Sequence, residues 1–228
     1  SANPLVDVIE RAIKAERPTA LYLTSPDYLG NTIDLAPIAK ICHDRGVLLL
    51  VDNAHGAYLR YLSPSRHPID LGADLCCDSA HKTLSALTGA AYLHVSPAHS
   101  ALCAEAKDAL LLFGSTSPSY LILQSLDLTN PMMETLPERL NAFVPRLDAL
   151  KASLARRGWT LFGNEPIKLT LMPKPLGYTG AALAAMLEEH GIFCEFADPD
   201  FLVCMFTPEN DADDLKRFER VLSEIPAC

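Results

Sequence analysis

Five consecutive apolar residues, Val47–Val51, constrain the fold of this chain more than any other segment. A strand that is apolar at every position is typical of one that is covered on both faces, as inside a parallel sheet. Segments 4–16 and 35–45 have a helical period and are predicted helices. Strands that alternate with helices predict an α/β fold with a mostly parallel sheet and flanking helices. The other predicted strands of this part are 20–23, 74–77 and 91–95.

The pattern changes near Trp159, which indicates a second structural unit. Before it, the predicted helices are 97–112, 118–128 and 133–157, the last one interrupted at Pro145. After it, we predict strands at 167–171, 192–197 and 201–206 and helices at 180–190 and 211–224, with Asp211 at the start of the last helix. We therefore divide the chain into a large α/β domain, 1–145, and a small α+β domain, 146–228.

The composition excludes several classes of function. The net charge of −9 argues against a nucleic-acid partner, because neutralising phosphates requires clustered Lys and Arg. No apolar run reaches the ~18 residues that a membrane helix needs. The first residues, SANP, do not begin a signal peptide. We expect a cytoplasmic protein with neither a membrane nor a nucleic-acid partner.

The cysteines are predicted to be free thiols. Their number is odd, they form no CxxC pair, and several lie in apolar runs. This pattern fits a reducing cytosol better than disulfides or a zinc site, so we expect no metal site. The seven are Cys42, Cys76, Cys77, Cys103, Cys194, Cys204 and Cys228.

Two of the predicted strands are followed by clusters of reactive side chains. Residues 51–57 read VDNAHGA, and residues 78–83 read DSAHKT. Because ligands of open parallel sheets bind at the carboxyl ends of the strands, we expect Asp52, His55 and Lys82 to meet there. An acid, a His and a lone Lys in this arrangement suit pyridoxal phosphate (PLP) catalysis. In that chemistry the Lys forms a Schiff base with the cofactor aldehyde, and the Asp partners the pyridinium nitrogen.

Each of these residues also has a structural explanation when it is taken alone. An Asp that closes a strand often caps the next turn, an isolated His is often structural, and most Lys side chains are solvated. The combination favours a functional interpretation, most strongly for Lys82, which follows a buried strand and has a partner motif at Asp52.

Neighbouring residues complete the predicted site. Ala54 is small enough for a ring to lie flat against the backbone, and Ser79 and His81 could reach a phosphate or position the Lys82 amine. Residues 113–117, FGSTS, precede a predicted helix, where amides and hydroxyls suit a phosphate. An ordinary capping turn explains this loop equally well.

These segments resemble the PLP-dependent enzymes of the aspartate aminotransferase fold, fold type I, and within it the major domain of the Orn/Lys/Arg decarboxylases. The resemblance implies that Lys82 is the Schiff-base lysine, that Asp52 is the partner of the ring nitrogen, and that His55 lies beside the ring. The stretches that carry it are 23–30, 51–57, 72–74, 79–84, 86–88, 116–121 and 177–180.

The resemblance also implies roles for the surrounding residues. Ala54 would pack on the ring. The family usually has Glu where this chain has Asn53 and Thr where it has Ala80, and neither position is an expected cofactor contact. The residues that the resemblance places near a phosphate are Ser79, His81, Thr116 and Ser117. Thr116 and Ser117 belong to a loop that, in such dimers, approaches the phosphate of the neighbouring subunit.

The resemblance further implies that parts of the enzyme are missing from this chain. Such enzymes begin with a segment that carries three sheet strands, the glycine-rich phosphate loop and the residue that stacks on the pyridine ring. We therefore expect 1–145 to be the second half of a PLP-binding large domain and 146–228 to be the small domain. A missing N-terminal segment or the second subunit of a homodimer is expected to cover the sheet edge. The isolated chain is expected to have little activity.

The function implied is the PLP-dependent decarboxylation of a basic amino acid, namely lysine, arginine or ornithine. One alternative is another fold-type-I activity, an aminotransferase or a lyase, with the same Lys82 and Asp52. A second alternative is a catalytically silent, truncated homologue that serves as a structural or interaction piece. A nucleotide-binding α/β domain is less favoured, because neither GxGxxG nor GxxxxGK[ST] occurs.

Overall fold

A computed structural model describes residues 4–226, so Cys228 lies outside the described residues. The chain divides into two units, each with its own four-stranded sheet. Unit 1 holds the residues up to Pro26 together with Ile33–Leu136, and unit 2 holds Asp27–Thr32 together with the residues from Pro137 onward. These units are defined by contacts and not by independent folding, so the domain boundary expected at residue 145 stays a prediction.

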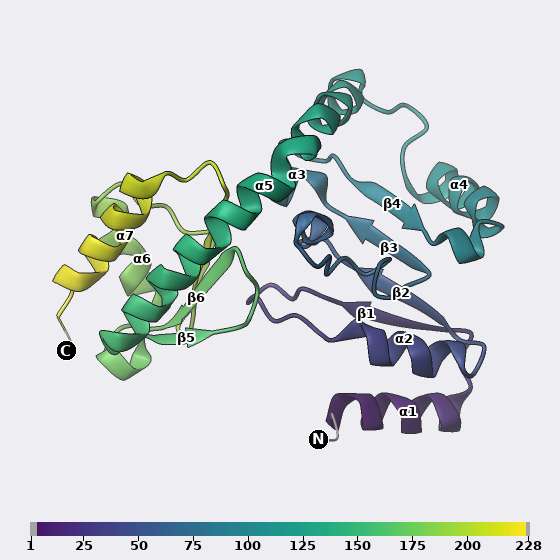
Figure 1. Cartoon of the computed structure of the whole chain (residues 1–228), viewed down its shortest axis with the longest axis horizontal. Helices are drawn as coiled ribbons and strands as arrows, with labels where there is room; N and C mark the ends of the chain where they lie inside the picture. The colour runs from purple at the N-terminus through teal and green to yellow at the C-terminus, as the bar shows by residue number, and fades with distance from the viewer. Residues whose placement is uncertain (1–3, 227–228) are drawn as a thin grey trace. The chain divides into compact units, whose positions relative to one another are not determined.

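Unit 1 is the α/β part of the chain (Figure 1). Its sheet has the order β1-β2-β3-β4, in which β1, β2 and β3 run parallel and β4 is antiparallel to β3. The prediction of a mostly parallel sheet with helices is confirmed. The elements, where η marks a 3₁₀ helix, are α1 (Pro4–Glu16), β1 (Ala20–Thr24), α2 (Leu35–His43), β2 (Leu48–Asp52), η1 (Ala57–Tyr61), β3 (Leu75–Asp78), α3 (Ala80–Thr83), β4 (Tyr92–Val95), η2 (Pro97–His99), α4 (Leu102–Phe113) and the first part of α5 (Tyr120–Arg156).

The apolar run around β2 forms the centre of unit 1. Leu49 and Val51 are buried in one apolar cluster with Ile38 of α2 and Ile13 of α1. Successive strand residues point to opposite faces, and the alternate residues Leu48, Leu50 and Asp52 are only half-buried. The sequence predicted cover on both faces. Within the described residues the full cover lies on the face that packs against α1 and α2.

Unit 2 contains an antiparallel sheet and helices. Its sheet has the order β5-β6-β8-β7, and every neighbouring pair is antiparallel. Asp211 begins the last helix as predicted, since its side chain accepts hydrogen bonds from the first turn. The strand predicted at 192–197 is shorter, because only its last two residues pair with β8. The elements after α5 are β5 (Thr160–Phe162), β6 (Lys168–Met172), η3 (Lys174–Leu176), α6 (Gly180–Glu189), β7 (Phe196–Ala197), β8 (Leu202–Met205) and α7 (Ala212–Glu224).

A single helix, α5, replaces the two helices predicted at 118–128 and 133–157, and Pro145 does not interrupt it. A proline inside a helix costs ~3 kcal/mol or more, because it removes a backbone donor and crowds the preceding turn. Burial of one large apolar side chain contributes ~1.5–3 kcal/mol, so a buried stripe outweighs this cost. The buried side chains of α5 in unit 2 are Leu140, Phe143, Leu147, Leu150 and Leu154. Among residues 4–226, no helix is both long and apolar enough to cross a membrane.

Residues 27–32 belong to unit 2 although they directly follow β1 and Pro26. Lys168 and Thr170, both on β6, donate side-chain hydrogen bonds to backbone carbonyl groups of this segment. Lys168 also forms an ion pair with Glu165 at 3.1 Å, and both side chains are almost completely buried. Such a pair is sensitive to the loss of one partner, because the other charge is then left in a medium that solvates it poorly.

We predict that Glu165→Gln lowers the free energy of unfolding of unit 2 by ~3–5 kcal/mol, because the buried Lys168 ammonium loses its counter-charge. The matched change Glu209→Gln removes an exposed partner of Arg139 and should cost less than ~1 kcal/mol. Denaturant unfolding followed by the fluorescence of Trp159, the only tryptophan and a buried residue, measures both. Equal losses in the two variants would contradict this account of the buried pair.

Candidate active site

The candidate site lies where β2 and β3 end side by side. Asp52, the last residue of β2, is paired with Cys77 in a parallel register. The segment 53–56 and the short helix α3 therefore leave the sheet at the same edge, where the sequence analysis expected a ligand site. His55 lies in the first segment and Lys82 in α3.

Lys82 and His55 are in direct contact. Lys82 Nζ lies 3.0 Å from His55 Nε2; His55 is buried and Lys82 is half-buried. An ammonium group has only donors, so Lys82 donates and Nε2 accepts, which assigns the ring proton of a neutral His55 to Nδ1. Among the ion pairs of the described residues, none involves Lys82. The amine is thus held by a group that can accept its proton, and not by a carboxylate.

Asp52 accepts hydrogen bonds on both of its carboxylate oxygens. The backbone N–H of Ala54 donates to Oδ1 at 3.0 Å, and the hydroxyl of Tyr22 donates to Oδ2 at 3.1 Å. Burial, together with the hydrogen bond to Asp52 and its negative charge, raises the pKa of Tyr22. Tyr22 therefore keeps its proton and remains a donor to the carboxylate. A half-buried carboxylate oriented in this way can hold a proton on a ring nitrogen.

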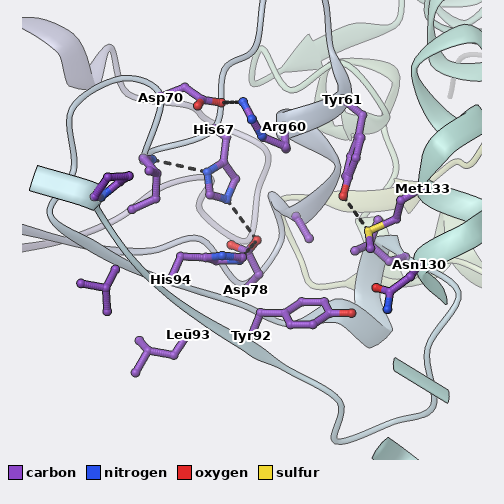
Figure 2. A pocket seen from close by; sticks show the side chains of 15 residues that line it. Arg60, Tyr61, His67, Asp70, Asp78, Tyr92, Leu93, His94, Asn130 and Met133 are labelled. Atoms are coloured by element: carbon purple, nitrogen blue, oxygen red, sulfur yellow. Dashed lines mark hydrogen bonds and ion pairs between the residues drawn. The ribbon is translucent and has the colours of Figure 1, made fainter. Parts of the chain in front are cut away.

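A buried carboxylate behind this edge connects the two motifs. Asp78 accepts a hydrogen bond from the Asn53 amide at 2.7 Å. His67 and His94, which Figure 2 shows beside Asp78, place Nε2 at 3.1 and 3.0 Å from its other oxygen. We call Asn53, His67, Asp78 and His94 the Asp78 cluster. Because Asn53 follows Asp52 and Asp78 precedes α3, this cluster fixes the segment of His55 relative to the helix of Lys82.

The electrostatics of Asp78 follow from these contacts. Burial by itself raises the pKa of this carboxyl group, but the hydrogen bonds from His67, His94 and Asn53 lower it well below its ordinary value. The carboxylate is thus ionised and satisfied inside unit 1. Asn53 and Asp78 belong to the two sequence motifs, but the sequence gives neither of them a predicted role. It gave no signal for His67 and His94, which lie 11 and 16 residues from Asp78.

A cavity of about 640 Å³ lies beside the Asp78 cluster in unit 1 (Figure 2). Its lining includes His67, Asp78 and His94 together with the aromatic rings of Tyr61 and Tyr92. None of the residues predicted for the site lines this cavity. The contacts at the strand ends, and not this cavity, therefore define the candidate active site.

The other predicted site residues are placed as follows. Ser79 precedes α3, but its side chain forms no capping hydrogen bond, and His81 Nδ1 lies 3.0 Å from the carbonyl oxygen of Ala90. Thr116 and Ser117 are exposed in the segment between α4 and α5. Within residues 4–226, no described hydrogen bond connects either of them to Lys82. The structure brings Lys82 into contact with His55, which lies three residues after Asp52.

These groups suit PLP chemically. An amine that lacks a carboxylate partner can attach an aldehyde, and a fixed carboxylate can partner a pyridinium nitrogen. The Ser79 hydroxyl, unused as a helix cap, is one available phosphate ligand.

The family of the chain is shown by comparison with known proteins. Residues 3–162 match the family model of the Orn/Lys/Arg decarboxylase major domain. The chain belongs to the Orn/Lys/Arg decarboxylase family, as the sequence resemblance indicated. The match covers all of the strands and helices that build the candidate site.

Individual relatives agree with this assignment. The chain is 34% identical over 189 residues to the uncharacterized protein YaaO of Bacillus subtilis. This match covers 78% of this chain and 39% of the relative. It is 29% identical over 229 residues to an arginine decarboxylase of the same organism, covering 92% of this chain and 46% of the relative. An arginine decarboxylase of Halalkalibacterium halodurans is 28% identical over 238 residues, covering 96% and 48%. The chain spans less than half the length of these relatives.

We predict that Asn53→Ala lowers the free energy of unfolding by ~1–3 kcal/mol, because an oxygen of the buried Asp78 loses its donor. Asn130→Ala, at an exposed position of α5, is the matched control and should change stability by no more than ~0.5 kcal/mol. Urea unfolding followed by circular dichroism measures both. If Asn53→Ala is as stable as the parent chain, the proposed connection between the two motifs is wrong.

The lowered pKa of Asp78 predicts a loss of stability in acid. The unfolded carboxyl has a pKa of ~3.9, so the stability that ionised Asp78 contributes is complete above about pH 4 and declines as the pH falls towards its lower folded pKa. Asp78→Asn should be less stable at neutral pH and should show a flatter decline below pH ~4. Urea midpoints measured against pH test this, with Asp108→Asn, exposed on α4, as the control that keeps the slope of the parent chain.

Proposed function

We propose that this chain carries the lysine side of a PLP-dependent active site, in a protein that decarboxylates a basic amino acid. The contact of 3.0 Å between Lys82 and His55, beside the oriented Asp52, is the observation that carries the proposal. It combines a reactive amine, a proton acceptor and a carboxylate at the carboxyl edge of a mostly parallel sheet. Membership of the family and the arginine decarboxylases among the relatives support a basic amino acid as the substrate.

The chemistry divides between the cofactor and the residues of the chain. PLP, when bound, supplies an aldehyde that takes up amines and a ring that accepts the electrons released as carbon dioxide leaves. Lys82 must be uncharged to act as a nucleophile, and His55 Nε2 is positioned to receive its proton. Asp52, held by Ala54 and Tyr22, is positioned to keep a proton on the ring nitrogen. The same Lys82 amine can return a proton to the substrate carbon.

The remaining parts of the site belong to the same proposal. Ser79 and His81 would bind the phosphate, and the small Ala54 would leave room for the ring. The exposed Thr116 and Ser117 would approach the phosphate of a second subunit, which makes a homodimer the proposed assembly. Unit 1 would then be part of a fold-type-I large domain in a cytoplasmic enzyme.

Product analysis tests the proposal. The chain is incubated with PLP and with arginine, lysine or ornithine. Because little activity is expected of the isolated chain, a low but measurable release of carbon dioxide together with the corresponding amine is the expected result. Lys82→Ala should abolish the product, whereas Lys107→Ala, exposed on α4, should leave it unchanged. Formation of an oxo acid would favour an aminotransferase instead. Absence of both turnover and PLP binding would favour a catalytically silent homologue.

A further inference from the structure

A second cluster of His and Asp side chains lies at the other end of β3, away from Lys82. Asp74 directly precedes β3, His43 is the last residue of α2, and His99 is the last residue of η2. His43 Nε2 lies 3.1 Å from both carboxylate oxygens of Asp74, and His99 Nε2 lies 3.0 Å from Oδ1. Three segments that are far apart in the sequence thus converge on one carboxylate.

The spacing of these atoms is close to that of a metal coordination shell. Two ligand atoms that are each ~2.0–2.2 Å from a tetrahedral ion lie roughly 3.4 Å from one another. The two His–Asp distances here are 3.0 and 3.1 Å, and one ligand atom from each of the three residues lies within 4.8 Å of the others. Small rotations of the side chains would therefore admit an ion.

The carboxylate is fixed and the histidines are accessible. The side chain of Asp74 is 2% exposed, and its Oδ2 accepts the backbone N–H of Leu49 at 2.7 Å. The side chains of His43 and His99 are 43% and 38% exposed, so an ion and its remaining water ligands can reach them from solvent. This combination leaves one rigid ligand and two that can adjust.

The two clusters differ in which ring nitrogen of their histidines can be free to bind a metal. In the Asp78 cluster, His67 Nδ1 accepts the backbone N–H of Ile69 at 3.4 Å, so the ring proton lies on Nε2 and points to Asp78. That nitrogen has no lone pair for a metal. Among the described hydrogen bonds, none involves Nδ1 of His43 or His99. Either ring can therefore carry its proton on Nδ1 and present Nε2 to an ion.

The local electrostatics also favour a cation. His43 ends α2, and the carbonyl groups at the end of a helix carry a partial negative charge. The Asp74 carboxylate is buried beside it, and the chain as a whole has a net charge of −9. A divalent ion would compensate the buried carboxylate more completely than the hydrogen bonds of the two imidazoles.

We propose that His43, Asp74 and His99 bind a divalent transition-metal ion of the Zn²⁺ class, with solvent as the remaining ligand. Two imidazoles and one carboxylate are a ligand set that suits this class of ion. The bound ion connects α2, β3 and η2, so it stabilises unit 1 at the end of the sheet opposite the candidate active site. The sequence alone predicts no metal site, because the cysteines form no CxxC pair and these three residues are separated by 31 and 25 positions.

Isothermal titration of the untagged chain with ZnCl₂ tests the proposal. We expect one ion per chain, and His43→Gln and His99→Gln should each weaken the affinity by more than ~10-fold. His94→Gln, which changes the Asp78 cluster, is the matched control and should keep the affinity of the parent chain. Zinc at ~100 times its Kd should raise Tm by roughly 5 °C in the parent chain and in His94→Gln only.

Several results would overturn the site. These are no detectable binding, unchanged affinity in His43→Gln and His99→Gln, or a loss confined to His94→Gln. A thiolate-to-metal charge-transfer band in the Co²⁺-loaded chain would assign the ion to cysteines instead. Circular dichroism and Tm in EDTA establish that each variant is folded. The two histidines are exposed enough that at least one variant should pass this check.

Discussion

The parallel pairing of β2 with β3, together with the hydrogen bond between Asn53 and Asp78, positions His55 and Lys82 at the candidate active site. The pairing brings the carboxyl ends of the two strands to one edge, and the hydrogen bond of 2.7 Å then joins the segments that leave them. His55 and Lys82 each lie within four residues of this bond, which leaves little freedom in their relative position. The 3.0 Å contact between them follows from this arrangement.

Burying an ionised carboxylate between two segments costs desolvation free energy, and the hydrogen bonds around Asp78 offset this cost. Three side-chain nitrogens donate to Asp78, so its charge is satisfied without solvent. An apolar contact at this position could be as stable, but it would not specify the direction of the two segments so narrowly. Stability and the geometry of the candidate site therefore depend on the same group in this chain.

Much of this organisation could be predicted from the sequence, and the rest depended on long-range contacts. The apolar run before Asp52 and the motifs around His55 and Lys82 predicted the sheet and the edge at which the site lies. The continuity of α5 through Pro145 could not be predicted locally, because a buried stripe in unit 2 outweighs the cost of the proline. For a similar reason, the sequence could not predict the contacts of His67 and His94 or the cluster of His43, Asp74 and His99. Side chains that are separated by many positions converge only after the strands are paired.

Lys82 is the amine that we propose holds PLP. Borohydride reduction of the chain after incubation with PLP, followed by peptide mapping, tests it directly. We expect one reduced adduct on Lys82. Its yield should be lower in Asp52→Asn and unchanged in Lys107→Ala. An adduct spread over exposed lysines, or none on Lys82, would contradict this proposal.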